Sequence, residues 1–77
     1  MATIAQIRAA RGLIGWSQTQ LADAAGLSRA TVARAETVEV SDEAIAMLRQ
    51  ALEKAGVIFV EENGDGPGVR LRKGNRK

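Results

Sequence analysis

The stretch SQTQLADAAGLSRATVARAE, residues Ser17–Glu36, decides the fold of this chain. It contains two short helical patterns on either side of Gly26, and each follows a serine that can cap a helix N-terminus. Ser17 is followed three residues later by Gln20, which is the spacing of a capping box. Only a glycine, a leucine and the cap Ser28 separate the two patterns. A connection this short predicts two helices that cross steeply.

Two longer helices are expected on either side of this pair. Thr3 is a good N-cap with Gln6 three residues later, so a helix should follow it and end at Gly15 in a left-handed conformation. A second helix should cover about 42–55, capped by Ser41 and ended by Gly56. Acidic residues in its first turn suit the positive end of the helix dipole.

The C-terminal part of the sequence changes to a strand pattern. Residues 57–60 read VIFV, a short run of residues that favour strands. Residues 62–68 are rich in turn formers, and after them Val69, Leu71 and Lys73 alternate with arginines. We expect a β-hairpin with a long loop, in which Val69, Leu71 and Lys73 share one buried face. Residues 74–77 should form a loose basic tail.

Composition limits the function classes. The chain has 77 residues, enough for one small domain, with no cysteine and no histidine. Disulfides, thiolate metal sites and the commonest general base are therefore excluded. No set of residues suited to acid–base chemistry converges, so we expect neither an enzyme nor a cofactor or metal. No apolar run reaches the roughly 20 residues of a membrane span, and nothing resembles a secretory signal, so a cytoplasmic location is expected.

Charge is distributed unevenly along the chain. Residues 1–34 carry four arginines and one aspartate, residues 35–66 carry eight acids and two bases, and residues 67–77 carry five bases and no acid. This pattern fits either solvated surfaces with a loose basic tail, or a positive face suited to a polyanion. Charge alone favours neither interpretation.

Residues 4–52 resemble the Cro/lambda-repressor type of helix-turn-helix domain, the XRE family. The resemblance rests on Arg11, Trp16, Ser17, Gln18, Leu21, Ala22, Gly26, Leu27, Ser28, Val32 and Glu36. Residues 55–73 resemble the C-terminal extension of a group of small bacterial regulators of this type. The expected fold is mainly α, a four-helix lambda-repressor-like helix-turn-helix domain over 1–56 with a short β-hairpin or strand extension over 57–73 and a flexible tail over 74–77.

The resemblance implies roles for individual residues. Gln18 matches a residue that contacts DNA phosphate and supports the recognition helix. Positions that usually face DNA in the major groove are occupied here by Ser28, Arg29, Ala30, Thr31 and Arg34. An arginine can offer two donors to a guanine edge, and alanine or the threonine methyl can pack on a thymine methyl. Arg29 is the favoured base-reading residue, and Arg34 either reads a base or contacts phosphate.

Arg11 and Glu36 have two interpretations. Arg11 could contact DNA, or it could form the internal salt bridge with Glu36 that the family suggests, which we favour. The chain departs from the family two residues after Glu36, where Val38 replaces the usual glycine.

The sequence therefore predicts a sequence-specific DNA-binding transcriptional regulator, a repressor that acts on double-stranded DNA as a homodimer at a pseudo-palindromic operator. The dimer should use the helix at 42–55 and the β segment, which carry more apolar residues than a small monomer hides. One arrangement would join strands of the two copies across the two-fold axis. One alternative is an antitoxin or phage-type regulator, and another is a protein-interaction adaptor with the same fold. A toxin or RNA polymerase would be the protein partner in such cases.

Overall fold

The computed structural model describes residues 2–38, 40–61 and 64–72. The elements within these residues are α1 (Ile4–Leu13), α2 (Gln18–Ala25), α3 (Arg29–Ala35), α4 (Asp42–Lys54), β1 (Val57–Val60) and β2 (Gly68–Leu71). The predicted class, four helices followed by a short antiparallel hairpin, is confirmed.

The helix ends follow the local signals in the sequence. Thr3 and Gln6 form a complete capping box at α1, and Ser17 and Gln20 form another at α2. Gly26 ends α2 in the left-handed region at φ 74°. A residue with a Cβ adopts this region at a cost, so the glycine explains how the chain turns into α3 within two residues.

The described residues of the connection between α3 and α4 include no left-handed residue. Val38 stands where the family usually has glycine, and no non-glycine residue that the structure describes has a positive φ. The backbone N–H groups of Thr37 and Val38 both donate to the carbonyl of Arg34. Helix α4 then begins behind the Ser41 cap and ends at Lys54, one residue before the predicted end.

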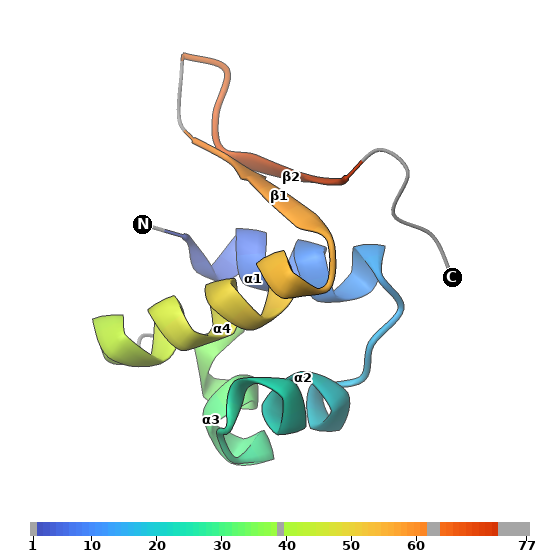
Figure 1. Ribbon diagram of the computed structural model, residues 1–77. Helices are drawn as coiled ribbons and strands as arrows, with labels where there is room; N and C mark the ends of the chain where they lie inside the picture. The colour runs from blue at the N-terminus through green and yellow to red at the C-terminus, as the bar shows by residue number, and fades with distance from the viewer. Residues whose placement is uncertain (1, 39, 62–63, 73–77) are drawn as a thin grey trace.

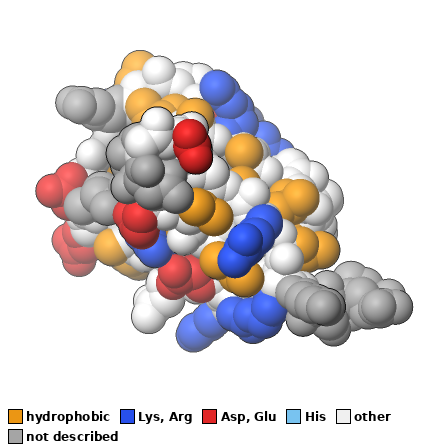
Figure 2. Space-filling model, turned by 90° about the horizontal axis from the view of Figure 1, so that it is seen from above, with side chains coloured by type: hydrophobic (Ala, Val, Ile, Leu, Met, Phe, Trp, Pro, Cys, Tyr) orange, Lys and Arg blue, Asp and Glu red, His pale blue; other side chains and the backbone are white. Residues whose placement is uncertain are grey.

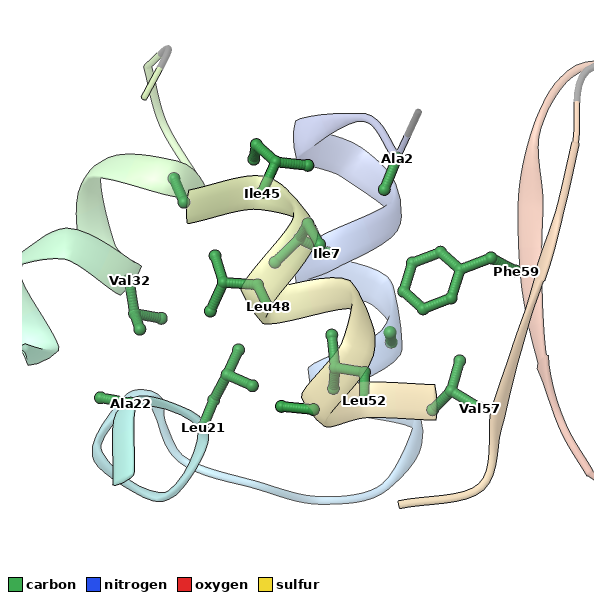
Figure 3. Packing of buried hydrophobic residues seen from close by; sticks show 13 residues of the cluster. Ala2, Ile7, Leu21, Ala22, Val32, Ile45, Leu48, Leu52, Val57 and Phe59 are labelled. Atoms are coloured by element: carbon green, nitrogen blue, oxygen red, sulfur yellow. The ribbon is translucent and has the colours of Figure 1, made fainter. Parts of the chain in front are cut away.

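The elements stack in three levels. Helices α1 and α4 form the middle, the α2–α3 pair lies on one side of them, and the hairpin lies on the other side (Figure 1). Figure 3 shows Phe59 and Val57 pointing from the hairpin toward the helices, with Leu52 of α4 among them. The largest fully buried side chains are Ile7, Leu21, Leu48, Leu52, Glu36, Val32 and Val57. One core therefore joins the helices and the hairpin.

The hairpin is fixed to the first helix by a buried side chain. Gln6 is 5% exposed, and its Nε2 donates to the carbonyl of Val60 at 3.1 Å and to that of Gly68 at 2.9 Å. Val60 and Gly68 are partners in the antiparallel register. One amide therefore holds both strands at the loop end of the hairpin.

One expectation for the hairpin was wrong. Leu71 was expected on the buried face, but it is 41% exposed, while Val57 and Phe59 of β1 are buried. The reason is that β1 already closes the core against the helices, and β2 forms the outer edge of the sheet with only Val69 packed against the core. Lys73 and the tail at 74–77 lie outside the described residues.

Candidate nucleic-acid interface

One face of α3 anchors the helix and the opposite face is open. Val32 and Ala35 are fully buried, which fixes the helix on the core. Arg29, Ala30 and Arg34 are exposed on the other side. Because this exposed stripe carries two guanidinium groups and no acid, it is suited to an anionic surface.

The N-terminus of α3 is organised by its own hydroxyl groups. Ser28 Oγ accepts a hydrogen bond from the backbone N–H of Thr31 at 3.1 Å and lies 3.0 Å from Thr31 Oγ1. Thr31 is half-buried beside the exposed Ser28. The cap thus orients the first turn of α3, which is the end that the resemblance places nearest to DNA bases.

Arg11, which is half-buried, forms an ion pair with the buried Glu36. Arg11 Nε donates to Glu36 Oε2 at 2.7 Å and Arg11 Nη2 donates to Glu36 Oε1 at 3.0 Å. The Glu36 side chain is only 2% exposed. A third donor of Arg11 binds the backbone carbonyl of Trp16 at 2.9 Å, so the pair joins α1, the start of α2 and the end of α3.

Gln18 connects this ion pair to the exposed face. Its Nε2 donates to Glu36 Oε1 at 3.2 Å, and its Oε1 accepts a hydrogen bond from Arg29 at 3.2 Å. The orientation of the amide is set by chemistry, because an ionised carboxylate accepts hydrogen bonds but cannot donate them. Gln18 must therefore present its oxygen to Arg29, and a continuous chain of hydrogen bonds runs from Arg11 to Arg29.

The ion pair sets the ionisation of its members. Burial raises the pKa of Glu36, but the hydrogen bonds from Arg11 and Gln18 and the nearby positive charges outweigh it, so this pKa lies below its ordinary value. The hydrogen bond to Glu36 raises the pKa of Arg11 above its ordinary value. Both groups are therefore charged at neutral pH, and the network remains intact there.

Arg8 has a role that the sequence analysis missed. Its Nη1 donates to the backbone carbonyl of Glu36 at 3.1 Å, at the C-terminus of α3. A cation at this end satisfies a carbonyl that has no partner within the helix and suits the helix dipole. The available signal was a second basic residue one turn before Arg11 on the same helix.

The arginines of the hairpin lie far from this face. Arg70 and Arg72 are exposed on or next to β2, which is separated from the α2–α3 pair by the middle layer (Figure 1). They therefore lie on the side of the molecule away from the exposed face of α3. Within residues 2–38, 40–61 and 64–72 no three histidine, cysteine or acidic residues are grouped to hold a metal. No helix in that part of the chain is both long and apolar enough to cross a membrane.

A capped helix pair with an exposed basic helix defines a helix-turn-helix DNA-binding domain. Residues 7–54, more than half of the chain, match the family model described as helix-turn-helix. The chain belongs to this family, in its Cro/lambda-repressor or XRE type, whose members are DNA-binding regulators. The comparisons with curated proteins and with solved structures found no match.

Proposed function

We propose that this protein is a sequence-specific transcriptional repressor that places α3 in the major groove of double-stranded DNA. The observation that carries the proposal is the hydrogen-bonded chain from the Arg11–Glu36 pair through Gln18 to the exposed Arg29. A side chain held this way has lost much of its freedom before binding. It therefore pays less entropy when it meets a base edge.

The contacts divide between base reading and positioning. Arg29 retains donors beyond the one that binds Gln18, and a guanidinium can bind the O6 and N7 of guanine. Ala30 and the methyl of Thr31 fit a thymine methyl. Gln18 and the Ser28 end of the helices would bind phosphate and set the register, and Arg34 would read a base or hold phosphate.

Two copies are needed for a specific operator. A single module of this kind buries a small surface on DNA, and such regulators pair two modules on half-sites about one helical turn apart. We therefore propose a homodimer on a pseudo-palindromic operator in the cytoplasm. Occupation of an operator excludes polymerase from an overlapping promoter, and for this reason we propose repression.

Selection of bound sequences from random double-stranded DNA tests this function. The expected product is a pair of inverted half-sites separated by about one helical turn. Enrichment of no sequence would contradict the proposal and leave the adaptor interpretation. Recovery of an operator together with a co-purifying toxin would place the same binding mode in an antitoxin.

A salt titration provides a second test with a matched control. Binding should weaken steeply with salt because phosphate contacts release counterions. If Arg34 contacts phosphate, Arg34→Ala should weaken binding to all sequences alike. It should also reduce by about one the slope of the logarithm of the binding constant against the logarithm of salt concentration. Lys54→Ala removes the same charge from the exposed end of α4 and should leave the slope unchanged.

A further inference from the structure

We propose that the outer edge of β2 pairs with β2 of a second copy, in antiparallel orientation, to form a continuous four-stranded sheet. This inference rests on the proposed function, which requires two copies, and assigns the strand edge and the register that join them. It differs from an interface on α4, because the contact is made by backbone hydrogen bonds at a sheet edge.

The ladder of the hairpin shows which backbone groups point outward. The N–H of Arg72 donates to the carbonyl of Gly56 at 2.7 Å. Hydrogen-bonded and non-hydrogen-bonded pairs alternate along antiparallel strands. Since Gly56 and Arg72 are hydrogen-bonded, Ile58 and Arg70 form the next hydrogen-bonded pair. The residues between them must then direct their N–H and C=O groups to the two outer edges of the sheet.

The two edges differ in exposure. On the β1 edge these residues are Val57 and Phe59, which are 1% and 6% exposed, so other parts of the chain cover that edge. On the β2 edge they are Val69, which is half-buried, and Leu71, which is 41% exposed. No backbone hydrogen bond joins these two β2 residues to another element within the described part of the chain. An open edge of this kind is a template for another strand.

Exposed apolar side chains lie at the C-terminal ends of β2 and of α1 beneath it. The Gln6–Gly68 hydrogen bond joins α1 and β2 near their first residues, and from there both run in the same direction (Figure 1). Each advances by about 10 Å, which brings Leu13 and Leu71 to the same end. These are two of the three large hydrophobic side chains that are exposed among the described residues. A second copy at the β2 edge would cover Leu71, which belongs to that edge.

Charge selects the register of the pairing. A two-fold axis that keeps the apolar faces on one side must pass through a residue of β2. An axis at Arg70 would place two arginines opposite each other, and an axis at Leu71 would place Arg70 opposite Arg72. An axis at Gly68 would place Val69 opposite Pro67, which has no backbone N–H to donate. An axis at Val69 places Arg70 opposite Gly68 and avoids the repulsions and this lost hydrogen bond. We therefore assign the axis to Val69.

The ends of the hairpin are complementary in charge. Its loop end carries the acids Asp65 and Glu61, of which Glu61 also pairs with Arg49 at 3.0 Å, while Arg70 and Arg72 lie toward its other end. Figure 2 shows hydrophobic surface exposed between acidic and basic groups on the hairpin side of the molecule. Antiparallel pairing about Val69 sets the basic end of each hairpin beside the acidic loop of the other. A parallel arrangement would place like charges together.

The same symmetry suits DNA binding. A two-fold axis perpendicular to the sheet keeps the layers of both copies in the same order. Because the α2–α3 pair lies on the side of the molecule away from the hairpin (Figure 1), both α3 helices would face in one direction. Two recognition helices must face this way to enter one duplex.

Disulfide trapping without DNA tests the register. The chain has no cysteine, and a Cβ at Gly68 would meet nothing within 4 Å. With the axis at Val69, Gly68 lies opposite Arg70 of the second copy in a non-hydrogen-bonded pair, where Cα atoms lie about 4.5 Å apart and a disulfide can form. A mixture of Gly68→Cys and Arg70→Cys proteins should give a disulfide-linked heterodimer, while each variant alone should not.

The controls give results that overturn the proposal. Self-linking of Arg70→Cys alone would overturn the assigned register. Self-linking of Gln50→Cys, on the exposed side of α4, together with no heterodimer in the mixture, would overturn the β2 edge as the interface.

Self-association gives an independent test. By sedimentation at tens of micromolar the protein should be a dimer, and Leu71→Lys should weaken the dimer at least tenfold. Val38→Lys is the matched control, because Val38 is 46% exposed but lies between α3 and α4. A monomeric protein, or equal effects of the two variants, would overturn the interface. These measurements contain no DNA, so a dimer that binds no DNA would instead refute the proposed function alone.

Discussion

Arg11 and Glu36 lie 25 residues apart in the sequence and are joined by two parallel hydrogen bonds of 2.7 and 3.0 Å. The pair ties α1 to the end of α3, where Glu36 is almost completely buried. The placement of the exposed helix face therefore depends on two charges, one of which cannot reach a ligand. A substitution of Glu36 therefore distinguishes an effect on the stability of the fold from an effect on direct DNA contacts.

Replacement of Glu36 by alanine should destabilise the fold by about 3–5 kcal/mol, because it leaves Arg11 half-buried without its counter-charge. Urea denaturation followed by circular dichroism measures this loss. Glu53→Ala is the matched control, since Glu53 also pairs with an arginine at 3.0 Å but is 43% exposed. It should cost less than about 1 kcal/mol. An unchanged melting temperature with altered DNA binding for Glu36→Ala would contradict the structural role.

The lowered pKa of Glu36 predicts the direction of pH dependence. A carboxylate whose pKa is lower in the folded state binds its proton more weakly than in the unfolded chain. Its contribution to stability is complete above the ordinary glutamate value of about 4.3 and is lost as pH falls through the lower value of the folded state. Denaturation curves at several pH values between neutral and strongly acidic conditions measure it. The stability difference between the natural protein and Glu36→Gln should shrink in this acidic range, and a difference independent of pH would refute the assignment.

Gln18 and Arg29 should be coupled in DNA binding. Gln18 positions Arg29 through the 3.2 Å hydrogen bond, so Gln18→Ala should reduce the contribution of Arg29 to the free energy of DNA binding. In a double-mutant cycle on the selected operator, the two losses should differ from additivity by about 0.5–3 kcal/mol. Gln18→Ala combined with Arg34→Ala is the control, because no hydrogen bond joins these side chains in the described structure, and these losses should add. Additivity of the first pair would show that Gln18 does not position Arg29.

Arg29→Ala alone should weaken binding to the selected operator by about 1–3 kcal/mol and relax the preference at one base pair. Binding measured on the operator and on its single-base variants gives this result. Equal weakening on every sequence would make Arg29 a phosphate contact only.

Two glycines should respond in opposite directions to alanine. Gly26 has a φ of 74°, where a Cβ is disfavoured, so Gly26→Ala should destabilise the fold by about 1–2 kcal/mol. Gly12 lies in α1 with nothing within 4 Å of an added Cβ, so Gly12→Ala should stabilise it by up to about 1 kcal/mol. Thermal unfolding of the two variants compares them directly. A loss of stability for Gly12→Ala would mean that the last turn of α1 does not behave as regular helix.

The elements of the fold could be predicted because their signals are local. A capping box depends on residues three positions apart, so Ser17 and Gln20 could be recognised from spacing alone. Gly26 marked the end of α2 for the same reason, since one residue determines whether the chain can turn there. Helix length and order followed from these boundaries.

Contacts between elements were less accessible from the sequence. Gln6 was recognised only as a capping residue, because nothing local indicates that its Nε2 reaches Val60 and Gly68. Leu71 followed the alternation of a buried strand, but its exposure depends on which strand closes the core. In the candidate interface, the resemblance indicated a supporting role for Gln18, whereas its bonds to Glu36 and Arg29 required the geometry of three helices.

The Gln6 clamp also has a consequence for the order of folding. Its two acceptors lie 54 and 62 residues after Gln6 in the sequence, so these bonds close long loops. Long loops carry a larger entropic cost and tend to form late. The helices can assemble from nearer contacts first, and the hairpin then docks onto a nearly complete helical body. The side-chain amide of Gln6 therefore exchanges water for the two carbonyl groups only when the hairpin docks. Its protection from solvent marks the completely folded state.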